Sequence, residues 1–166
     1  MIYNIDMILR RLDKNEFNIA RKLFNEVIAR SQTFGWSKNW PSDEMICDDI
    51  DNKCLFGLFD ENKLIAISFA GPRYKNDYVS CWKENLKNPS RLSRICVHPD
   101  FQGKGIGFYF TKMLLKHLKK SGFDGTRILV AEENLKAISL YKKLGFTCQG
   151  KHFMDNINWL CLELKF

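Results

Sequence analysis

The run RICVHPDFQGKGIG, residues 94–107, is the most informative part of the chain, because an apolar strand passes through a glycine-rich turn into a helix expected over residues 105–120. The glycines at 103, 105 and 107 let the backbone fold tightly and leave several N–H groups on one side without Cβ atoms in the way. Those groups lie at the positive end of the helix dipole. The run therefore predicts a strand, a turn and a helix that can bind phosphate oxygens.

Two familiar phosphate-binding motifs can be compared with this turn. A dinucleotide-binding fingerprint needs G-x-G-x-x-G and an acid about 20 residues further on. Here the spacing is G-x-G-x-G, and Asp124 falls in an expected turn. A Walker A loop needs G-x-x-x-x-G-K-[ST], and this chain has no such run. An ordinary glycine-rich turn between a strand and a helix stays open on this run alone.

Outward from the turn, hydrophobic periodicity predicts further strands and helices. Asp13 with Glu16 resembles a capping box. Ser42 and Asn134 can cap two later helices, and Gly145 can end the last one. The expected helices are 13–31, 42–51, 105–120 and 134–144, and the expected strands are 5–12, 54–59, 64–70, 91–97, 127–131, one from 146 onward and 158–164. This order predicts a mixed α/β sheet with helices on its faces.

The composition predicts one globular domain over residues 1–166, since 45% of the residues are hydrophobic and 27% are charged. No run approaches the roughly 20 apolar residues of a membrane span, and the charged start of the chain differs from a signal peptide. We therefore expect a cytoplasmic protein without membrane contact. The net charge is +7, and residues 102–127 hold six Lys and Arg residues against one acid. This surplus fits an anionic ligand, a nucleic acid or a basic exterior.

Six cysteines are spread over the chain without a Cys-x-x-Cys pair, and no His lies at zinc-finger spacing. We therefore expect no metal site. Most of them, such as Cys96 and Cys161, lie in apolar runs and are expected to be reduced, buried thiols. A Cys–His hydrolase is disfavoured, because His98 precedes a proline and His117 lies in a lysine-rich helix, which favours turn, surface or packing roles.

Three motifs in order connect the chain with a known family. Residues 102–107, QGKGIG, match Q/R-x-x-G-x-G/A, the acetyl-CoA pyrophosphate loop of the GCN5-related N-acetyltransferases. Residues 94–99, RICVHP, are similar to the fourth strand of that family, and residues 134–146 to its second cofactor motif. The chain resembles this family over residues 91–150. The resemblance implies a central, mostly antiparallel sheet whose fourth and fifth strands splay apart, with helices on both faces.

The resemblance also implies a site for acetyl-CoA. The backbones of Ile95 and Val97 would hold its acetyl and pantetheine portion, and the N–H groups of the glycine turn its pyrophosphate. Asn134 would reach the pantetheine arm, and Tyr141 would lie near the thioester sulfur. Lys112 is an additional candidate for the CoA phosphates. The implied cofactor-binding set is Ile95, Cys96, Val97, Gln102, Gly103, Lys104, Gly105, Ile106, Gly107, Asn134, Ala137 and Tyr141.

The implied reaction is direct transfer of the acetyl group to a primary amine of a small molecule or a protein. Tyr141 would protonate the leaving thiolate as the catalytic acid. Many family members place a glutamate on strand four as the base, but residues 91–95 contain no carboxylate. The routes left open for the amine proton are ordered water, Glu132, Glu133, Asp77 and Glu84. An amine of low pKa would need no base.

In this family the first helices and the loop between strands three and four form the acceptor pocket. Residues 71–89 have no clear periodicity and predict a long loop. The candidate acceptor-binding residues are Trp36, Trp40, Tyr78 and Trp82. Their rings could enclose an apolar or cationic acceptor, or they could pack the loops onto the sheet.

Two other functions stay open. The missing carboxylate on strand four would also fit a CoA-binding module without turnover. A nucleic-acid-binding domain is disfavoured, because the aromatic residues are not interleaved with the basic helix. We expect an amine acceptor as the partner, no nucleic acid, and a monomer or homodimer.

Overall fold

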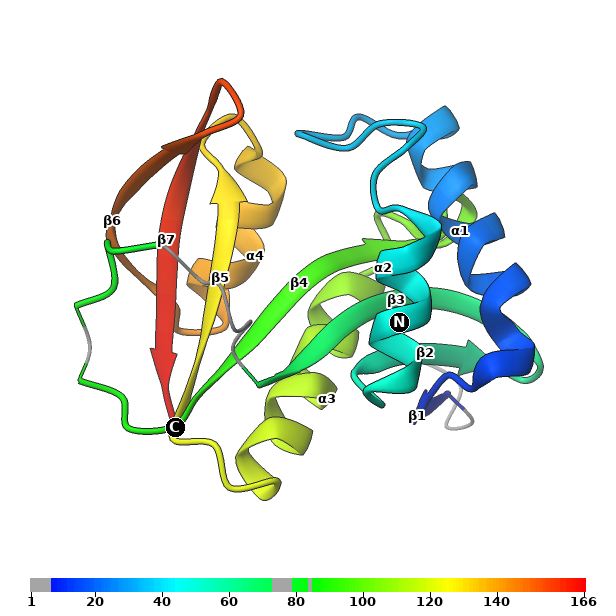
Figure 1. The fold of residues 1–166 in the computed structure, drawn as a ribbon, viewed down its shortest axis with the longest axis horizontal. Helices are drawn as coiled ribbons and strands as arrows, with labels where there is room; N and C mark the ends of the chain where they lie inside the picture. The colour runs from blue at the N-terminus through cyan, green and yellow to red at the C-terminus, as the bar shows by residue number, and fades with distance from the viewer. Residues whose placement is uncertain (1–6, 73–78, 84) are drawn as a thin grey trace. The chain divides into compact units, whose positions relative to one another are not determined.

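The computed structural model describes residues 7–72, 79–83 and 85–166, which form a seven-stranded mixed sheet and four α-helices (Figure 1). The elements in chain order are β1 (Ile8–Arg11), η1 (Lys14–Glu16), α1 (Phe17–Arg30), α2 (Asp43–Asp51), β2 (Leu55–Asp60), β3 (Lys63–Pro72), β4 (Pro89–Val97), η2 (Pro99–Phe101), α3 (Ile106–Lys120), β5 (Gly125–Ala131), α4 (Leu135–Lys143), β6 (Thr147–Met154) and β7 (Ile157–Lys165). The predicted order of helices and strands is confirmed. Two short 3₁₀ helices, η1 and η2, are additions to it.

The strand order in the sheet is β1-β2-β3-β4-β5-β7-β6. The pairs β1–β2, β2–β3, β5–β7 and β6–β7 are antiparallel, and β4–β5 is parallel. This confirms the mostly antiparallel mixed sheet. The ladder described between β4 and β5 runs from the pair Pro89 and Gly125 to the pair Arg91 and Arg127. Both strands continue beyond it, to Val97 and to Ala131.

The contacts divide the chain into two compact units. Unit 1 comprises the described residues of Met1–Phe69 and Arg94–Phe110, and unit 2 those of Ala70–Ser93 and Thr111–Phe166. The strands β3 and β4 and the helix α3 each contribute residues to both units.

Unit 1 has its core between two helices and the sheet. The apolar face of α1 recurs at steps of three and four residues, with Ala20, Leu23, Phe24 and Val27 all buried. These side chains cluster with buried residues of α2, β2 and β3, so that α1 and α2 cover one face of the sheet (Figure 1). Full burial of a side chain such as Phe24 contributes about 1.5–3 kcal/mol.

Short polar contacts start the helices where the sequence predicts them. The Asn15 N–H donates to Asp13 Oδ1 at 2.9 Å, and the Asp13 N–H donates to Glu16 Oε2 at 3.0 Å. This confirms the capping box, although the helix that directly follows it is η1, and α1 begins at Phe17. The cap of α2 is confirmed as well, since the Met45 N–H donates to Ser42 Oγ at 3.2 Å.

Unit 2 contains β5, β6 and β7 together with α4. The Ala137 N–H donates to Asn134 Oδ1 at 3.1 Å and caps α4, as predicted. Gly145, with φ of 91°, follows the helix in the left-handed conformation, which glycine adopts without steric cost. Asp155 and Asn156 both have positive φ and form the tight turn that joins β6 to β7.

The prediction that the cysteines are reduced is wrong for two of them. Cys81 and Cys161, which are 80 residues apart, form a disulfide with their Cα atoms 6.3 Å apart. Their pairing depends on how the segment before β4 folds against β7, and neither spacing nor local hydrophobicity reports that. Cys54 and Cys96 are free and buried, as expected, and burial raises the pKa of both thiols. Cys47 and Cys148 are free but exposed.

No helix in the described ranges is both long and apolar enough to cross a membrane.

Candidate functional site

The glycine turn of unit 1 joins η2 to the start of α3. Gly103 has φ of 74° and Gly105 has φ of 79°, a region that other L-residues enter only at a cost. A Cβ atom added at Gly103 would meet no atom within 4 Å, so this side of the turn is open. An α-helix leaves its first N–H groups without partners inside the helix, and they point toward this end. The turn therefore has the geometry of an anion-binding site.

Two polar side chains of the turn stabilise its own conformation. Gln102 Nε2 donates to the Ser31 hydroxyl and to the Val97 carbonyl oxygen, both at 2.9 Å. Lys104 Nζ donates to the Asp100 carbonyl oxygen at 2.9 Å. Since both side chains bind within the protein, the backbone N–H groups are the part of the turn best suited to phosphate oxygens.

A buried histidine ties the end of β4 to α1, and sequence reasoning missed its partners. His98 Nε2 lies 2.8 Å from Glu26 Oε2, and His98 Nδ1 accepts from the Asp100 N–H at 3.2 Å. Arg30 bridges the two acids, at 2.5 Å from Asp100 and 3.7 Å from Glu26. This cluster confirms His98 as a packing residue. The sequence left turn, surface and packing roles open for His98, and no local signal connects it with Glu26.

The end of β4 carries the residues expected to hold the acetyl and pantetheine portion. Cys96 is buried in the core of unit 1, and Ile95 and Val97 are half-buried. Just before them, Arg94 has φ of 53° in the middle of the strand and forms a buried ion pair with Asp49 of α2. Burial raises the pKa of Asp49, and the guanidinium opposes that rise. Asp49 shares the buried face of α2 with Ile46 and Ile50, a spacing that was visible in the sequence.

The remaining members of the expected cofactor site lie on α4 in unit 2. Asn134 caps this helix, Ala137 is half-buried one turn later, and Tyr141 is buried against Phe146, with ring centroids 5.6 Å apart. Burial raises the pKa of the Tyr141 phenol. An ordinary phenol, with a pKa near ~10, is already protonated at neutral pH, and the rise keeps Tyr141 protonated to still higher pH.

The aromatic residues expected at the acceptor site pack against their own chain. Trp36 lies 5.8 Å from Phe24 and 5.5 Å from Trp40 in unit 1, measured between ring centroids. Trp82 of unit 2 lies against two guanidinium groups, those of Arg91 and Arg127, each 5.3 Å from its ring. These contacts match the packing alternative. Tyr78 lies outside the described residues.

The carboxylates considered as bases differ in their surroundings. Glu132 forms an ion pair with Lys151, whereas Glu133 is exposed at the end of β5. Asp77 and Glu84 lie outside the described residues. Within the described part of the chain, no three His, Cys, Asp or Glu side chains gather as a metal site requires.

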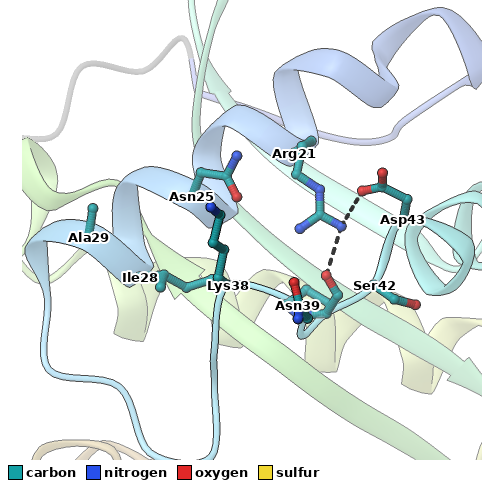
Figure 2. Close-up of a pocket in the computed structure, with 9 residues that line it drawn as sticks. Arg21, Asn25, Ile28, Ala29, Lys38, Asn39, Ser42 and Asp43 are labelled. Atoms are coloured by element: carbon teal, nitrogen blue, oxygen red, sulfur yellow. Dashed lines mark hydrogen bonds and ion pairs between the residues drawn. The ribbon is translucent and has the colours of Figure 1, made fainter.

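A cavity of about 730 Å³ lies in unit 1 between the outer face of α1 and the segment before α2 (Figure 2). Arg21 reaches across it, with Nη2 at 2.7 Å both from Asp43 Oδ1 and from the Pro41 carbonyl oxygen. The lining residues are Arg21, Asn25, Ile28, Ala29, Lys38, Asn39, Pro41, Ser42 and Asp43. A cavity of this volume is within the range of small-molecule sites, about 300–1,000 Å³, and it combines apolar surface with a few polar side chains.

Comparisons with curated proteins point to one family. A spermine/spermidine N(1)-acetyltransferase of Bacillus subtilis is 31% identical over 114 residues, which make up 64% of this chain and 70% of that protein. An uncharacterised N-acetyltransferase of Methanocaldococcus jannaschii is 35% identical over 74 residues, or 42% of this chain. The match spans only 33% of the length of that archaeal protein.

A solved structure agrees with these sequence matches. A GNAT-family acetyltransferase from Streptococcus agalactiae has the same fold, with a TM-score of 0.79 and 20% identity over 100% of this chain and 99% of that one. A sequence profile of the Acetyltransferase (GNAT) family matches residues 22–146. Because the profile covers most of the chain, including the glycine turn and α4, this protein belongs to the GNAT acetyltransferase family.

Proposed function

We propose that this protein is an N-acetyltransferase that moves the acetyl group of acetyl-CoA to a primary amine. The observation that carries the proposal is the glycine turn, where Gly103 and Gly105 have positive φ and the helix α3 begins directly afterwards. The open side of Gly103 leaves room for a pyrophosphate against the backbone. The family profile spans the same residues and supports a single N-acetyltransferase domain.

The proposed cofactor contacts follow the family motifs. The backbone of residues 102–107 binds the pyrophosphate, and the backbones of Ile95 and Val97 hold the acetyl and pantetheine end. Asn134 reaches the pantetheine arm with the part of its amide that does not cap α4. Lys112 is exposed on α3 and adds positive charge for the CoA phosphates. No metal takes part in this proposal.

Tyr141 supplies the catalytic proton. When an amine attacks the thioester, the developing oxyanion accepts a hydrogen bond from a strand-four N–H. The phenol can donate a hydrogen bond or a proton to the thiolate as it departs. Tyr141 is protonated before this step, and burial, which raises its pKa, makes the phenol hold its proton more strongly. The amine proton leaves through water or through Glu133, which is exposed at the end of β5.

The acceptor is a primary amine. A polyamine is one candidate, because the Bacillus subtilis relative is a spermine/spermidine N(1)-acetyltransferase. Lysine side chains of proteins are another. Since acetyl-CoA is a cytoplasmic metabolite, we propose that the enzyme works in the cytoplasm, as a monomer or homodimer.

A matched pair of variants tests the cofactor site. Gly103→Asp adds a carboxylate at the glycine turn, and Gly122→Asp adds one at the far end of α3. Both glycines have positive φ, 74° and 88°, and both have open space around an added Cβ atom. Repulsion between unit charges ~8 Å apart, at an effective dielectric constant of ~20, is about 2 kcal/mol, or about 30-fold in affinity.

We therefore expect Gly103→Asp to weaken acetyl-CoA binding at least 30-fold in calorimetry, and Gly122→Asp to leave it unchanged. Equal affinity of the two variants would overturn the placement of the pyrophosphate. Release of CoA is then measured with spermidine, a lysine peptide and an aminoglycoside as acceptors. Tight binding of acetyl-CoA without turnover on any of them would favour a CoA-binding module.

A further inference from the structure

The strand β4 has an irregular backbone at its centre. Arg94 has φ of 53°, in the left-handed region, although it is neither a glycine nor part of a turn. A residue in this conformation within a strand redirects the backbone groups that follow it. The conformation is unfavourable for a residue with a Cβ atom, so it persists only where other contacts hold it.

A buried ion pair holds Arg94 in this place. Its side chain is only 2% exposed, and it pairs with Asp49 of α2, whose side chain is 7% exposed. The Arg94 Cζ atom also lies 5.2 Å from the centre of the Phe69 ring on β3. Asp49 is fixed in turn, because the buried face of α2 that carries it also carries Ile46 and Ile50. These residues all belong to unit 1.

Arg94 directly precedes Ile95, Cys96 and Val97. Under the proposed function, N–H groups of this strand stabilise the charge on the acetyl oxygen, and such stabilisation requires a fixed donor direction. We propose that the Arg94–Asp49 ion pair is a positioning element that holds β4 in its left-handed irregularity and thereby orients these donors. The inference rests on the proposed function and adds two positioning residues to it.

The same ion pair connects the strand with the helix α2. The helix α2 carries Asp49 in its second half and begins at Asp43, which lines the cavity in Figure 2. A displacement of α2 would therefore act on Arg94 through the ion pair. Loss of the pair should affect turnover more than the affinity for acetyl-CoA.

A set of variants separates this role from a contribution to stability alone. Asp49→Asn removes the ion pair and leaves the Cβ atom of Arg94, so the strand can relax toward an extended conformation. Arg94→Ala removes the other member of the ion pair and keeps a Cβ atom at residue 94, so the strand can relax in the same way. Arg94→Gly also removes the ion pair, but glycine keeps a positive φ without steric cost. The double variant Asp49→Asn/Arg94→Gly combines a neutral helix residue with this permissive backbone.

We expect Asp49→Asn and Arg94→Ala to lower kcat about 10- to 100-fold, with little change in the KM for acetyl-CoA. Arg94→Gly should retain a kcat at least about fivefold above that of Arg94→Ala. The kcat of the double variant should likewise be higher than that of Asp49→Asn, although the double variant lacks both members of the ion pair. An element that acted only on stability would give no such rescue.

The control is Glu163→Gln, which breaks a second buried ion pair, Arg127–Glu163, with Nε and Oε1 2.6 Å apart in unit 2. Glu163→Gln should lower the melting temperature of the protein. Its kcat, measured well below that melting temperature, should not fall as the kcat of Asp49→Asn does. A second readout is the amide chemical shift of Ile95, which should move in Arg94→Ala and stay near its wild-type value in Arg94→Gly.

Equal kcat values for Arg94→Ala and Arg94→Gly, with no gain in the double variant, would overturn the inference. An inactive wild-type enzyme would instead refute the proposed function. In that case the amide shifts of the same variants still decide whether the ion pair sets the backbone at Arg94.

Discussion

Reduction of the Cys81–Cys161 disulfide should lower the stability of the protein. The two residues are separated by 80 positions, so the disulfide closes a long loop in the unfolded chain. For a loop of this length, the loss of chain entropy corresponds to about 4.5 kcal/mol at 25 °C, and native disulfides typically contribute about 2–4 kcal/mol. Cys161 is fully buried, so its thiol would stay in the core after reduction. We expect a loss of about 3 kcal/mol in the free energy of unfolding.

Urea unfolding followed by tryptophan fluorescence measures this loss. With a slope of about 2 kcal/mol per molar urea, the midpoint of the wild type should fall by about 1.5 M when dithiothreitol is added. Cys81→Ser should unfold at the lower midpoint with or without reductant, and it controls for effects on the four free cysteines. The assignment of this stability to the disulfide would be refuted if dithiothreitol left the urea midpoint of the wild type unchanged, or if it lowered the midpoint of Cys81→Ser by the same amount.

Three further predictions concern single residues. Gly125→Ala should lower the free energy of unfolding by about 1–3 kcal/mol in urea, because the new Cβ atom would lie 2.7 Å from a carbonyl oxygen of β7. The control is Gly122→Ala, whose Cβ atom meets open space and which should lower the free energy of unfolding by no more than about 1–2 kcal/mol. Tyr141→Phe should lower kcat about 10²–10⁴-fold at nearly constant acetyl-CoA affinity. Because the pKa of Tyr141 is raised, the wild-type kcat should not fall through loss of this proton near the ordinary phenol pKa of ~10. A fully active Tyr141→Phe variant would remove this residue as the acid. The hydrogen bond from Arg10 lowers the pKa of Glu16 in the folded protein. The ionised Glu16 therefore stabilises the protein above the ordinary Glu pKa, and this stabilisation should be lost as the pH falls from that value through the lowered pKa. In thermal unfolding, Glu16→Gln should not show this loss of stability in acid.

The parts of the molecule that local sequence specifies could be predicted closely. The helix expected over 105–120 is α3 at Ile106–Lys120, and the one expected over 134–144 is α4 at Leu135–Lys143. Caps and glycines fix such boundaries within a few residues, since their hydrogen bonds and φ angles involve neighbours in the chain. The same holds for the glycine turn, which is a local structure.

The parts that depend on distant contacts could not be predicted. Arg94 and Asp49 are 45 residues apart, and their pairing requires that α2 pack on β4. Alternation along a strand gives no sign of a left-handed residue other than glycine. Only the spacing of Asp49 from Ile46 and Ile50 in the sequence places this acid on the buried face of α2.

Trp82 shows why an aromatic loop residue does not by itself identify an acceptor site. An aromatic ring on a loop attracts cations, and a cationic acceptor is one source of them. Here the protein supplies the cations itself, since Arg91 and Arg127 both lie 5.3 Å from the ring, and Glu163 binds Arg127 as well as the N–H of Lys83. The disulfide at the neighbouring Cys81 holds the same segment on β7. Packing within unit 2 therefore accounts for the contacts of Trp82 without an acceptor.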